Sequence, residues 1–465
     1  MPHRTHRRRF IKAMAATGVG FWAAGGVSPR PSRSAIETIH FASIGVGGKG
    51  SSDSADAAAH GVMVAICDID ERNLERAANK WPEAKKYFDF RKMFDEMAGK
   101  IDAVTVSTPD HTHAVASAMA MNLGKACFTQ KPLTHSIWEA RRLAEIAREK
   151  KVATQMGNQG TAETNLRTSA ALIKAGVIGA VKEVHVWTNR PIWPQGIDRP
   201  KDTPPCPPEV HWDEFIGPAP YRPYHPAYHP FKWRGWWDFG TGALGDMACH
   251  TLNMAYMALD LRDPISVVAE TPGHNGETYP AWSVITYEFP ARNGRPPVKL
   301  VWYDGGKKPP RELLPPREAF KGPDGKELIE NDRQYANVIN TGCLVIGEKG
   351  TLFSPGDYGG DARHTGVWFD NKEYVIQSQI KEPRVEVKVS PGHFREWVDA
   401  IKGGEPAMSN FPDYAGGLTE TVLLGNLAVW ATGKKIEWDA ENLKATNAPE
   451  VAHIIKPEYR EGYSL

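Results

Sequence analysis

The segment from Ile39 to Asp70 constrains this chain more than any other part of the sequence. It reads IHFASIGVGGKG, then a stretch of helix length, then VMVAICDID. This pattern predicts an apolar strand, a glycine-rich turn, a helix and a second apolar strand that ends in an acid. Gly45, Gly47 and Gly50 stand in G-x-G-x-x-G spacing. They permit, in that order, a tight turn, approach of the backbone to a pyrophosphate, and close packing of the helix on the strand.

The unit therefore predicts a dinucleotide site. The diphosphate would rest on the N-terminal amides of the helix, and Asp68, at the end of the second strand, would accept hydrogen bonds from a ribose diol. A carboxylate there repels a 2′-phosphate, so the predicted cofactor is NAD rather than NADP. A glycine-rich turn without a ligand is the alternative. The cofactor-binding residues predicted in this unit are Gly45, Val46, Gly47, Gly48, Lys49, Gly50 and Asp68.

Charge is unevenly distributed along the chain. The 465 residues carry a formal net charge of +1, but residues 1–34 hold seven basic side chains and no acid. The remainder is therefore mildly acidic, with a net charge of −6, and gives nucleic-acid binding no electrostatic support. Five cysteines are scattered without C-x-x-C spacing, so we expect neither a disulfide framework nor a metal site.

The N-terminus has the composition of an export signal. Arg7-Arg8-Arg9-Phe10-Ile11-Lys12 precedes an apolar stretch rich in Gly and Ala that ends near Val27, and the pattern resembles the twin-arginine signal. The stretch is too short for a comfortable membrane span. We expect a periplasmic protein without a stable membrane span, exported after it has folded around its cofactor. A basic tail or an uncleaved anchor is the alternative.

The chain divides into segments of different character. Residues 1–35 form the signal segment, and residues 36–157 alternate apolar runs with amphipathic helices, which predicts a parallel Rossmann sheet. Residues 158–440 mix helices with strands at 182–190, 282–290, 298–305, 342–354 and 367–377, which predicts an α+β domain on an open, largely antiparallel sheet. Residues 441–465 form a C-terminal tail. The fold class predicted is therefore α/β, with an N-terminal parallel sheet and a C-terminal α+β domain.

Two further segments carry chemically useful side chains. Gln130 and Lys131 follow an apolar strand of the first domain, so they emerge at the carboxyl edge where open α/β sheets bind ligands. Asp246 and His250 are four residues apart and share one face of a predicted helix; such a pair suits proton abstraction from a hydroxyl group. The alternatives are a solvated surface lysine, a helix cap and a core histidine.

Aromatic side chains crowd the loop before that helix. Six of the fifteen tryptophans fall between residues 187 and 237. Flat rings suit the faces of sugars, so this loop is a candidate substrate site, whereas packing of the loop or a subunit contact is the alternative. The substrate-binding candidates are Arg190, Trp193, Arg234, Trp236, Trp237 and Asp246.

Taken together, these motifs resemble the glucose–fructose oxidoreductase/inositol dehydrogenase (Gfo/Idh/MocA) family, over the whole chain after the signal. The resemblance assigns Lys131 as the active-site lysine and Asp246 and His250 as the substrate-binding and proton-accepting pair. It also places Gln130, Lys131 and the segment with Thr108, Pro109 and His113 beside the cofactor, together with Asn158. Gln130 stands where many members have glutamate.

The resemblance implies hydride transfer between NAD and a sugar, polyol or glycoside hydroxyl. Because an exported enzyme cannot draw on a soluble NAD pool, we expect the cofactor to be tightly retained. A redox-neutral, NAD-dependent cleavage of a glycoside is the first alternative, and a non-catalytic sugar-binding protein is the second. Family members often pair through the open sheet, so a homo-oligomer, dimer or tetramer, is also expected.

Overall fold

The computed structural model describes residues 38–322, 324–370 and 372–465. The predicted signal segment, residues 1–35, lies outside these residues. None of the helices in the described residues combines the length and the apolar character of a membrane span.

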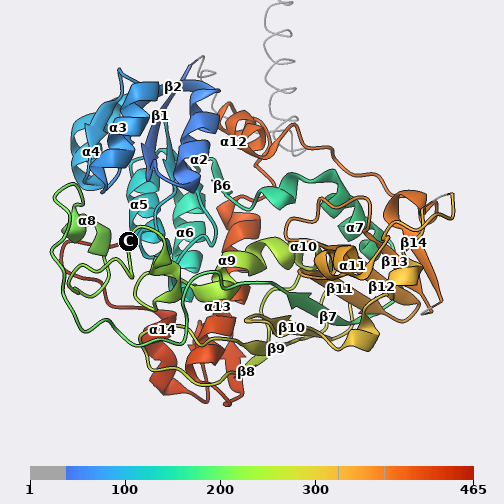
Figure 1. Cartoon of the computed structure of the whole chain (residues 1–465). Helices are drawn as coiled ribbons and strands as arrows, with labels where there is room; N and C mark the ends of the chain where they lie inside the picture. Colours follow the sequence, from blue (N-terminus) through green and yellow to red (C-terminus); the bar gives the residue numbers. More distant parts are fainter. Residues whose placement is uncertain (1–37, 323, 371) are drawn as a thin grey trace, which may run out of the picture. The chain divides into compact units, whose positions relative to one another are not determined.

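The first sheet is parallel and has six strands in the order β3-β2-β1-β4-β5-β6. Its central strands are apolar and almost wholly buried, as expected for a sheet covered on both faces. The strands are β1 (Ile39–Ile44), β2 (Gly61–Cys67), β3 (Lys85–Tyr87), β4 (Ala103–Val106), β5 (Ala126–Thr129) and β6 (Thr154–Met156). The helices between them are α2 (Lys49–Ala58), α3 (Glu71–Lys80), α4 (Phe90–Met97), α5 (Asp110–Asn122) and α6 (Ile137–Lys150). This arrangement confirms the predicted Rossmann sheet (Figure 1).

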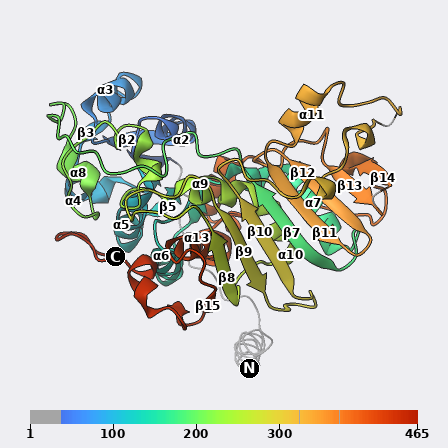
Figure 2. The same ribbon diagram turned by 60° about the horizontal axis from the view of Figure 1, so that its bottom comes forward.

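The second sheet has ten strands in the order β14-β13-β12-β11-β7-β10-β9-β8-β15-β16. All its pairs are antiparallel except β7 with β10, so the predicted, largely antiparallel sheet is confirmed. The strands are β7 (Val181–Trp187), β8 (Ser266–Glu270), β9 (Val284–Phe289), β10 (Val298–Tyr303), β11 (Gly342–Gly347), β12 (Gly350–Pro355), β13 (Gly366–Phe369), β14 (Glu373–Ile376), β15 (Ile436–Asp439) and β16 (Lys444–Ala445). Figure 2 shows these strands fanning away from the Rossmann sheet.

The structure corrects two predicted strands of this sheet. Residues 342–354 form the antiparallel pair β11 and β12 rather than one strand, because Glu348 and Lys349 make the turn between them. Residues 367–377 likewise contain two strands, β13 and β14, paired with each other.

Some of the helices that follow the Rossmann sheet pack on one face of this second sheet, and the segment between β10 and β11, which includes a short helix, covers part of the other face. The helices after the Rossmann sheet are α7 (Thr164–Lys174), α8 (Trp212–Ile216), α9 (Gly242–Thr251), α10 (Asn253–Leu259), α11 (Asp332–Val338), α12 (His393–Ile401), α13 (Gly416–Trp430) and α14 (Ala452–Ile455). Helix α13 contacts α6, α9 and β8, so it joins the two sheets. On the opposite face, Leu314, Phe320 and Tyr335 pack in one cluster with Phe353 and Tyr374. The same cluster includes residues of β7, β10 and β11, so the chain itself covers that face from β10 to β14.

Candidate active site

The glycine loop has the geometry that its spacing predicts. Gly45 has a φ of +80°, and a Cβ there would lie 2.5 Å from the carbonyl oxygen of Ser107. A Cβ on Gly50 would lie 2.0 Å from the carbonyl oxygen of Gly45, so only glycine lets α2 begin this close to β1. Gly48 is the N-cap of α2 and provides no side-chain cap. The first amides of α2 therefore face the site without a side-chain acceptor, as an anion-binding helix end requires.

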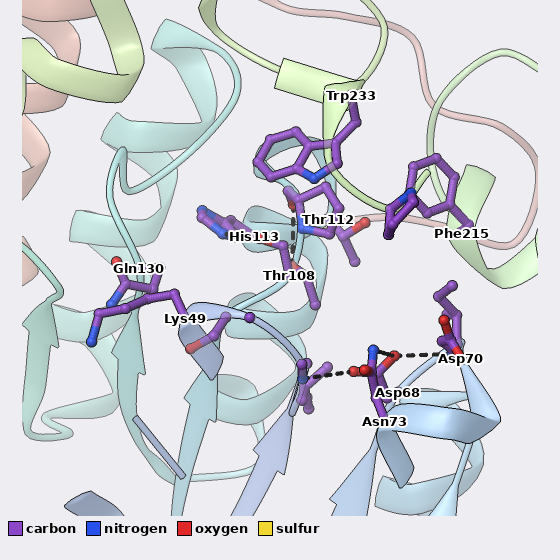
Figure 3. A pocket seen from close by; sticks show the side chains of 18 of the residues that line it. Lys49, Asp68, Asp70, Asn73, Thr108, Thr112, His113, Gln130, Phe215 and Trp233 are labelled. Atoms are coloured by element: carbon purple, nitrogen blue, oxygen red, sulfur yellow. Dashed lines mark hydrogen bonds between the residues drawn. The ribbon is translucent and has the colours of Figure 1, made fainter. Parts of the chain in front are cut away.

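Asp68 lies at the end of β2 and is bound to the glycine loop. Its Oδ2 accepts hydrogen bonds from the backbone N–H groups of Val46 at 2.9 Å and Gly47 at 3.1 Å. Its Oδ1 accepts from the backbone of Asp70 and from the side chain of Asn73. Burial raises the pKa of Asp68, and these four donors oppose that effect. The carboxylate thus fixes the loop while it borders the cavity that a nucleotide would enter (Figure 3).

One cavity of about 890 Å³ joins this loop to the predicted chemical residues. It is lined by the glycine loop and Asp68 and also by Lys131, Asp246 and His250. Gln130, Thr108, Pro109 and His113 also line it. A single cleft thus holds both the anion-binding loop and the three side chains with proton-transfer and charge-stabilising chemistry.

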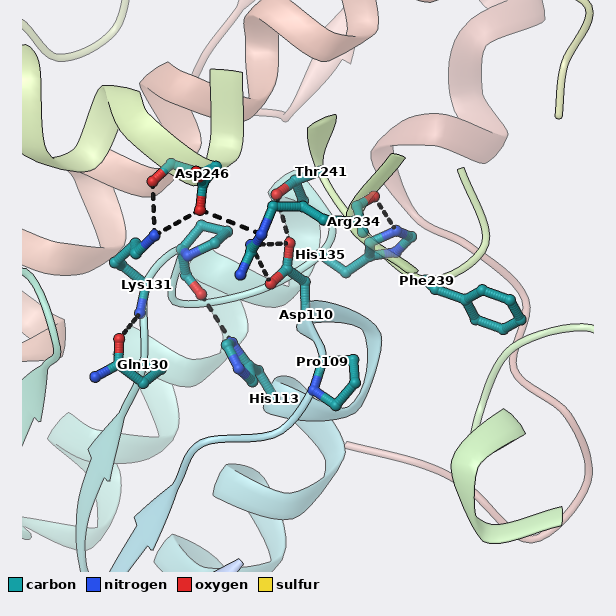
Figure 4. A network of polar contacts seen from close by, with 12 residues as sticks. Pro109, Asp110, His113, Gln130, Lys131, His135, Arg234, Phe239, Thr241 and Asp246 are labelled. Carbon is teal, nitrogen blue, oxygen red and sulfur yellow. Dashed lines mark hydrogen bonds and ion pairs between the residues drawn. The ribbon is translucent and has the colours of Figure 1, made fainter. Parts of the chain in front are cut away.

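Lys131 and Asp246 form a buried ion pair. Lys131 Nζ lies 2.8 Å from Asp246 Oδ1 and 2.7 Å from the Asp246 carbonyl oxygen (Figure 4). Burial by itself raises the pKa of the Asp246 carboxyl, but Lys131 and Arg234 outweigh burial and hold that pKa well below its usual range. Asp246 is therefore a carboxylate at every physiological pH and can accept hydrogen bonds from a substrate hydroxyl.

His250 lies one helical turn after Asp246 on α9 and is buried. Burial, followed by the charge of Lys131, lowers its pKa well below the usual range. Its Nδ1 has no protein partner among the described residues. A neutral imidazole in this position can accept a proton at pH 7, which is the property that a general base needs.

Arg234 holds Asp246 from the other side. Its Nη1 lies 2.8 and 3.0 Å from the two carboxylate oxygens of Asp110, and its Nε lies 3.2 Å from Asp246 Oδ1. Thr241 donates a hydrogen bond to Asp110 Oδ2. Figure 4 shows this network joining the start of α5 to α9. Arg234 lines the cavity as the sequence predicts, but its guanidinium is already paired with two carboxylates.

Three other predicted residues are close to the site but not in its lining. Arg190 lies 3.6 Å from Asp246 through its Nε, and the ring of Trp193 lies beside the Arg234 guanidinium. Asn158 is fully buried, and its side chain binds Ser409 and the carbonyl oxygen of Cys249. These three residues therefore support neighbouring side chains and backbone in this structure.

The structure corrects the substrate role predicted for Trp236 and Trp237. Trp236 is 1% exposed and packs with Tyr228, and its indole N–H donates to the carbonyl oxygen of Ala227. Trp237 stacks on Tyr279 at 3.8 Å between ring centroids. Neither ring lines the cavity: Trp236 belongs to the apolar cluster of the loop itself, whereas Trp237 packs in the main core and contacts Trp430 of α13.

Two further aromatic residues line the cavity: the sequence gives no signal for Tyr358, whereas Trp233 belongs to the aromatic loop that the sequence predicts as a candidate substrate site. The ring of Tyr358, in the loop between β12 and β13, contacts His250 edge-on, with ring centroids 4.6 Å apart. Trp233, in the aromatic loop, faces the cavity opposite Thr108 and His113 (Figure 3). Tyr358 is distant in sequence from every motif, so only the fold brings it to the site.

A segment of the second domain covers the cofactor cleft. We call residues 207–240 the roof segment. Its backbone bonds to the loop after β2: His211 N–H donates to Ile69 O, and Glu209 O accepts from Glu71 N–H. Phe215, Phe231 and Trp233 of the roof segment line the cavity. Buried His111 of α5 also binds the roof, at the carbonyl oxygens of Phe215 and Phe239.

These features define a Rossmann-type oxidoreductase site, and comparison with known proteins gives its family. Residues 39–158 match the "Oxidoreductase family, NAD-binding Rossmann fold", and residues 164–294 match the "Oxidoreductase family, C-terminal alpha/beta domain". The chain belongs to the Gfo/Idh/MocA family, and its Rossmann domain is of the NAD-binding type.

Individual relatives are distant. An alpha-N-acetylgalactosaminidase of Shewanella oneidensis is 29% identical over 205 residues, which cover 38% of this chain and 44% of that protein. A scyllo-inositol 2-dehydrogenase (NAD⁺) of Bacillus subtilis is 32% identical over 106 residues, 23% of this chain and 28% of that protein. This chain thus matches less than half the length of these curated relatives.

A solved structure extends the likeness to the whole fold. The WlbA dehydrogenase of Bordetella pertussis, in complex with NADH and UDP-GlcNAcA, superposes with a TM-score of 0.57 at 16% identity. The match covers 86% of this chain and 99% of that one. At this identity the likeness shows a shared two-domain fold.

Proposed function

We propose that this protein is an NAD-dependent oxidoreductase that acts on a hydroxyl group of a sugar, polyol or glycoside. The observation that carries the proposal is that Lys131, Asp246 and His250 line the same cavity as the glycine loop. NAD held at that loop supplies a hydride acceptor. The remaining chemistry belongs to the side chains.

Each of the three side chains has a defined task. His250 is neutral and takes the proton of the reacting hydroxyl, a contribution of about 10²–10⁴-fold in rate. Lys131 Nζ donates a hydrogen bond to the same oxygen as negative charge develops on it. Asp246, which is itself paired with Arg234, holds Lys131 in place and accepts a hydrogen bond from a second hydroxyl. With the proton removed and the charge on the oxygen stabilised, the carbon that bears the hydroxyl can transfer hydride to NAD.

We further propose that the cofactor is retained through many turnovers. The roof segment supports this proposal, because it lies over the cleft and is bound to the Rossmann domain by backbone hydrogen bonds and by the ion pairs His211–Glu71 and Arg72–Glu209. Exchange of NAD would require these contacts to open. A retained cofactor also fits the proposed export of the protein.

A second candidate function is redox-neutral cleavage of a glycoside. Transient oxidation of a sugar hydroxyl would acidify a neighbouring C–H bond, and elimination would expel the aglycone and leave an unsaturated ketone. Addition of water to that ketone, followed by return of the hydride and a proton, would restore the sugar and NAD. The match to the Shewanella oneidensis alpha-N-acetylgalactosaminidase favours this candidate. It needs the same base, lysine and cofactor site.

One experiment separates these functions. Purified protein is denatured and assayed for released NAD, and the intact protein is then presented with sugars and glycosides. A lasting rise in absorbance near 340 nm indicates a dehydrogenase, whereas aglycone release without net NADH indicates redox-neutral cleavage. Lys131→Met should abolish both. Absence of bound NAD, of NAD binding and of turnover would overturn the proposal.

Location and assembly are proposed on other grounds. We propose export by the twin-arginine route from Arg7-Arg8-Arg9-Phe10-Ile11-Lys12; an R7K/R8K variant should then stay in the cytoplasm.

We also propose a homo-oligomer, a dimer or tetramer. Because the chain covers its outer sheet face from β10 to β14 with a cluster that includes Leu314, Phe320 and Tyr335, an interface on that face would use β8 and β9. Light scattering of the pure protein, and of Thr286→Arg on β9, tests this.

A further inference from the structure

A buried carboxylate that takes no part in the chemistry above lies beneath the glycine loop. Asp53, on α2, is only 2% exposed. Its Oδ1 pairs with Lys49 Nζ at 2.7 Å, and its Oδ2 accepts hydrogen bonds from Ser107 Oγ at 2.7 Å and Gln130 Nε2 at 2.9 Å. The three donors come from the glycine loop end of α2, the end of β4 and the end of β5. All three donor residues line the cavity, although Asp53 itself does not.

This carboxylate determines which way the Gln130 amide points. A carboxylate oxygen only accepts hydrogen bonds, so the group facing Asp53 must be the NH₂ and not the carbonyl of the amide. The Gln130 Oε1 then points away from Asp53 and accepts a hydrogen bond from Lys131 N–H at 3.3 Å. Gly157 leaves the space for this arrangement, because a Cβ there would lie 2.5 Å from Gln130 Nε2.

We propose that Asp53 is a positioning residue for the cofactor site: it orients Gln130 so that an amide oxygen, an acceptor, is presented beside Lys131 where a ribose hydroxyl of NAD would bind. The Asp53 carboxylate also supplies a negative charge beside Gln130, where the family glutamate would carry one, and Lys49 pairs with this carboxylate. This explains why glutamine replaces the glutamate that the family resemblance leads one to expect. A glutamate at position 130 would set two carboxylates at hydrogen-bond distance, and such a pair must share a proton.

The inference rests on the proposed NAD-dependent function and predicts a specific coupling between positions 53 and 130. Gln130→Glu alone should weaken NAD binding about 10–100-fold at pH 8 and recover as the pH falls and the two carboxylates bind a proton. Asp53→Asn alone should also weaken binding, because an amide at position 53 no longer dictates the orientation of Gln130. The double variant D53N/Q130E should bind NAD within a few-fold of the wild type, and its pH dependence should disappear. In that variant the amide introduced at position 53 can donate to the carboxylate introduced at position 130, so donor and acceptor are exchanged and the pair is kept.

Binding is measured directly, by calorimetric titration of NAD into protein stripped of nucleotide, at pH 6 and pH 8. Asp56→Asn is the matched control, because Asp56 is exposed on the same helix and should leave affinity unchanged. Urea unfolding of each variant shows whether the variant is still folded. If Q130E alone is unfolded, the inference is tested by comparing the NAD affinities of D53N and the double variant. The inference would be overturned if the loss of NAD affinity in the double variant equalled the product of the losses in the two single variants. It would also be overturned if Q130E bound NAD normally at pH 8. Failure of the wild type to bind NAD would instead overturn the proposed function.

Discussion

At the scale of single residues, the protonation of His250 sets the acid limit of turnover. Its pKa is lowered first by burial and then by Lys131, so the imidazole stays neutral until the pH is well below 6.5, the usual value. We therefore expect kcat/KM for an accepted substrate to be level between pH 8 and 6.5 and to decline only in more acidic solution. A pH–rate profile measures this. An acid limb centred at or above 6.5 would show that another group limits the reaction.

Single residues differ widely in how well the sequence predicts their place in the site. Gly45, Gly50, Lys131, Asp246 and His250 are predictable because each belongs to a spaced motif, and the structure places all five in or around one cleft. Ring chemistry alone assigns Trp236 and Trp237 to the substrate, yet Trp236 is buried in the loop's own apolar cluster and Trp237 is buried in the main core. Composition can indicate what a ring could bind, but only the packing of a long loop decides which rings remain free.

Asp53 and Tyr358 escape prediction for a different reason. Each lies close to site residues only through contacts between elements: Asp53 meets Ser107 and Gln130 across strand ends, and Tyr358 meets His250 from another part of the second domain. No periodicity or spacing in a single sequence carries such long-range pairs. They depend on register and on the path of loops, which local propensities do not determine.

At the scale of elements, the start of α2 depends on close packing of Gly50 against the backbone of the glycine loop. A Cβ on Gly50 would lie 2.0 Å from a backbone oxygen of Gly45, and backbone cannot move aside as a side chain can. We expect Gly50→Ala to destabilise the fold by about 1–3 kcal/mol and to lose NAD. Gly99→Ala is the control, because a Cβ there meets nothing within 4 Å. Urea unfolding and nucleotide content measure both effects; equal behaviour of the two variants would contradict the assigned geometry.

The roof segment makes a second prediction at this scale. Arg460, in the C-terminal tail, pairs with Asp213 of α8 at 2.6 Å and donates to the carbonyl oxygen of Gly217. Removing it by Arg460→Ala should loosen the roof and speed NAD release several-fold, with little change in the stability of the whole chain. Stopped-flow displacement of bound NAD measures the release. Arg395→Ala, which removes an exposed pair within α12, should leave the rate as it is, and a rate unaffected by R460A would show that the roof does not limit exchange.

Alternation of apolar runs and helices is enough to predict the parallel sheet, because each βα unit buries both faces of its strand and so leaves a continuous apolar run. The second sheet is harder to divide. β11 and β12 read as one strand because Glu348 and Lys349 interrupt the apolar pattern only briefly. The segment between β10 and β11 has no regular periodicity, so its packing on the outer face of the sheet has no sequence signal.

At the scale of the whole molecule, α13 makes the two sheets dependent on each other. A Cβ on its Gly416 would lie 3.0 Å from Ala144 of α6, whereas a Cβ on its Gly425 would lie 2.1 Å from Tyr287 of β9. The same helix thus packs tightly on the Rossmann domain and on the second sheet. The apolar core is correspondingly continuous: buried side chains of both sheets and of α13 belong to one cluster.

This continuity predicts that the chain unfolds as one cooperative unit. Leu427 of α13 is fully buried, and Leu427→Ala should cost about 2–5 kcal/mol felt equally by both domains. Hydrogen exchange followed by mass spectrometry under increasing urea should show β1 and β9 losing protection at the same concentration, and L427A should lower both midpoints together. Bound NAD should raise both midpoints again, because at a hundredfold excess over its dissociation constant it adds about 2.7 kcal/mol to the free energy of unfolding. Were the two sheets independent, β1 and β9 would lose protection at different urea concentrations and L427A would not shift both midpoints equally; a shared midpoint therefore reports the coupling that α13 provides.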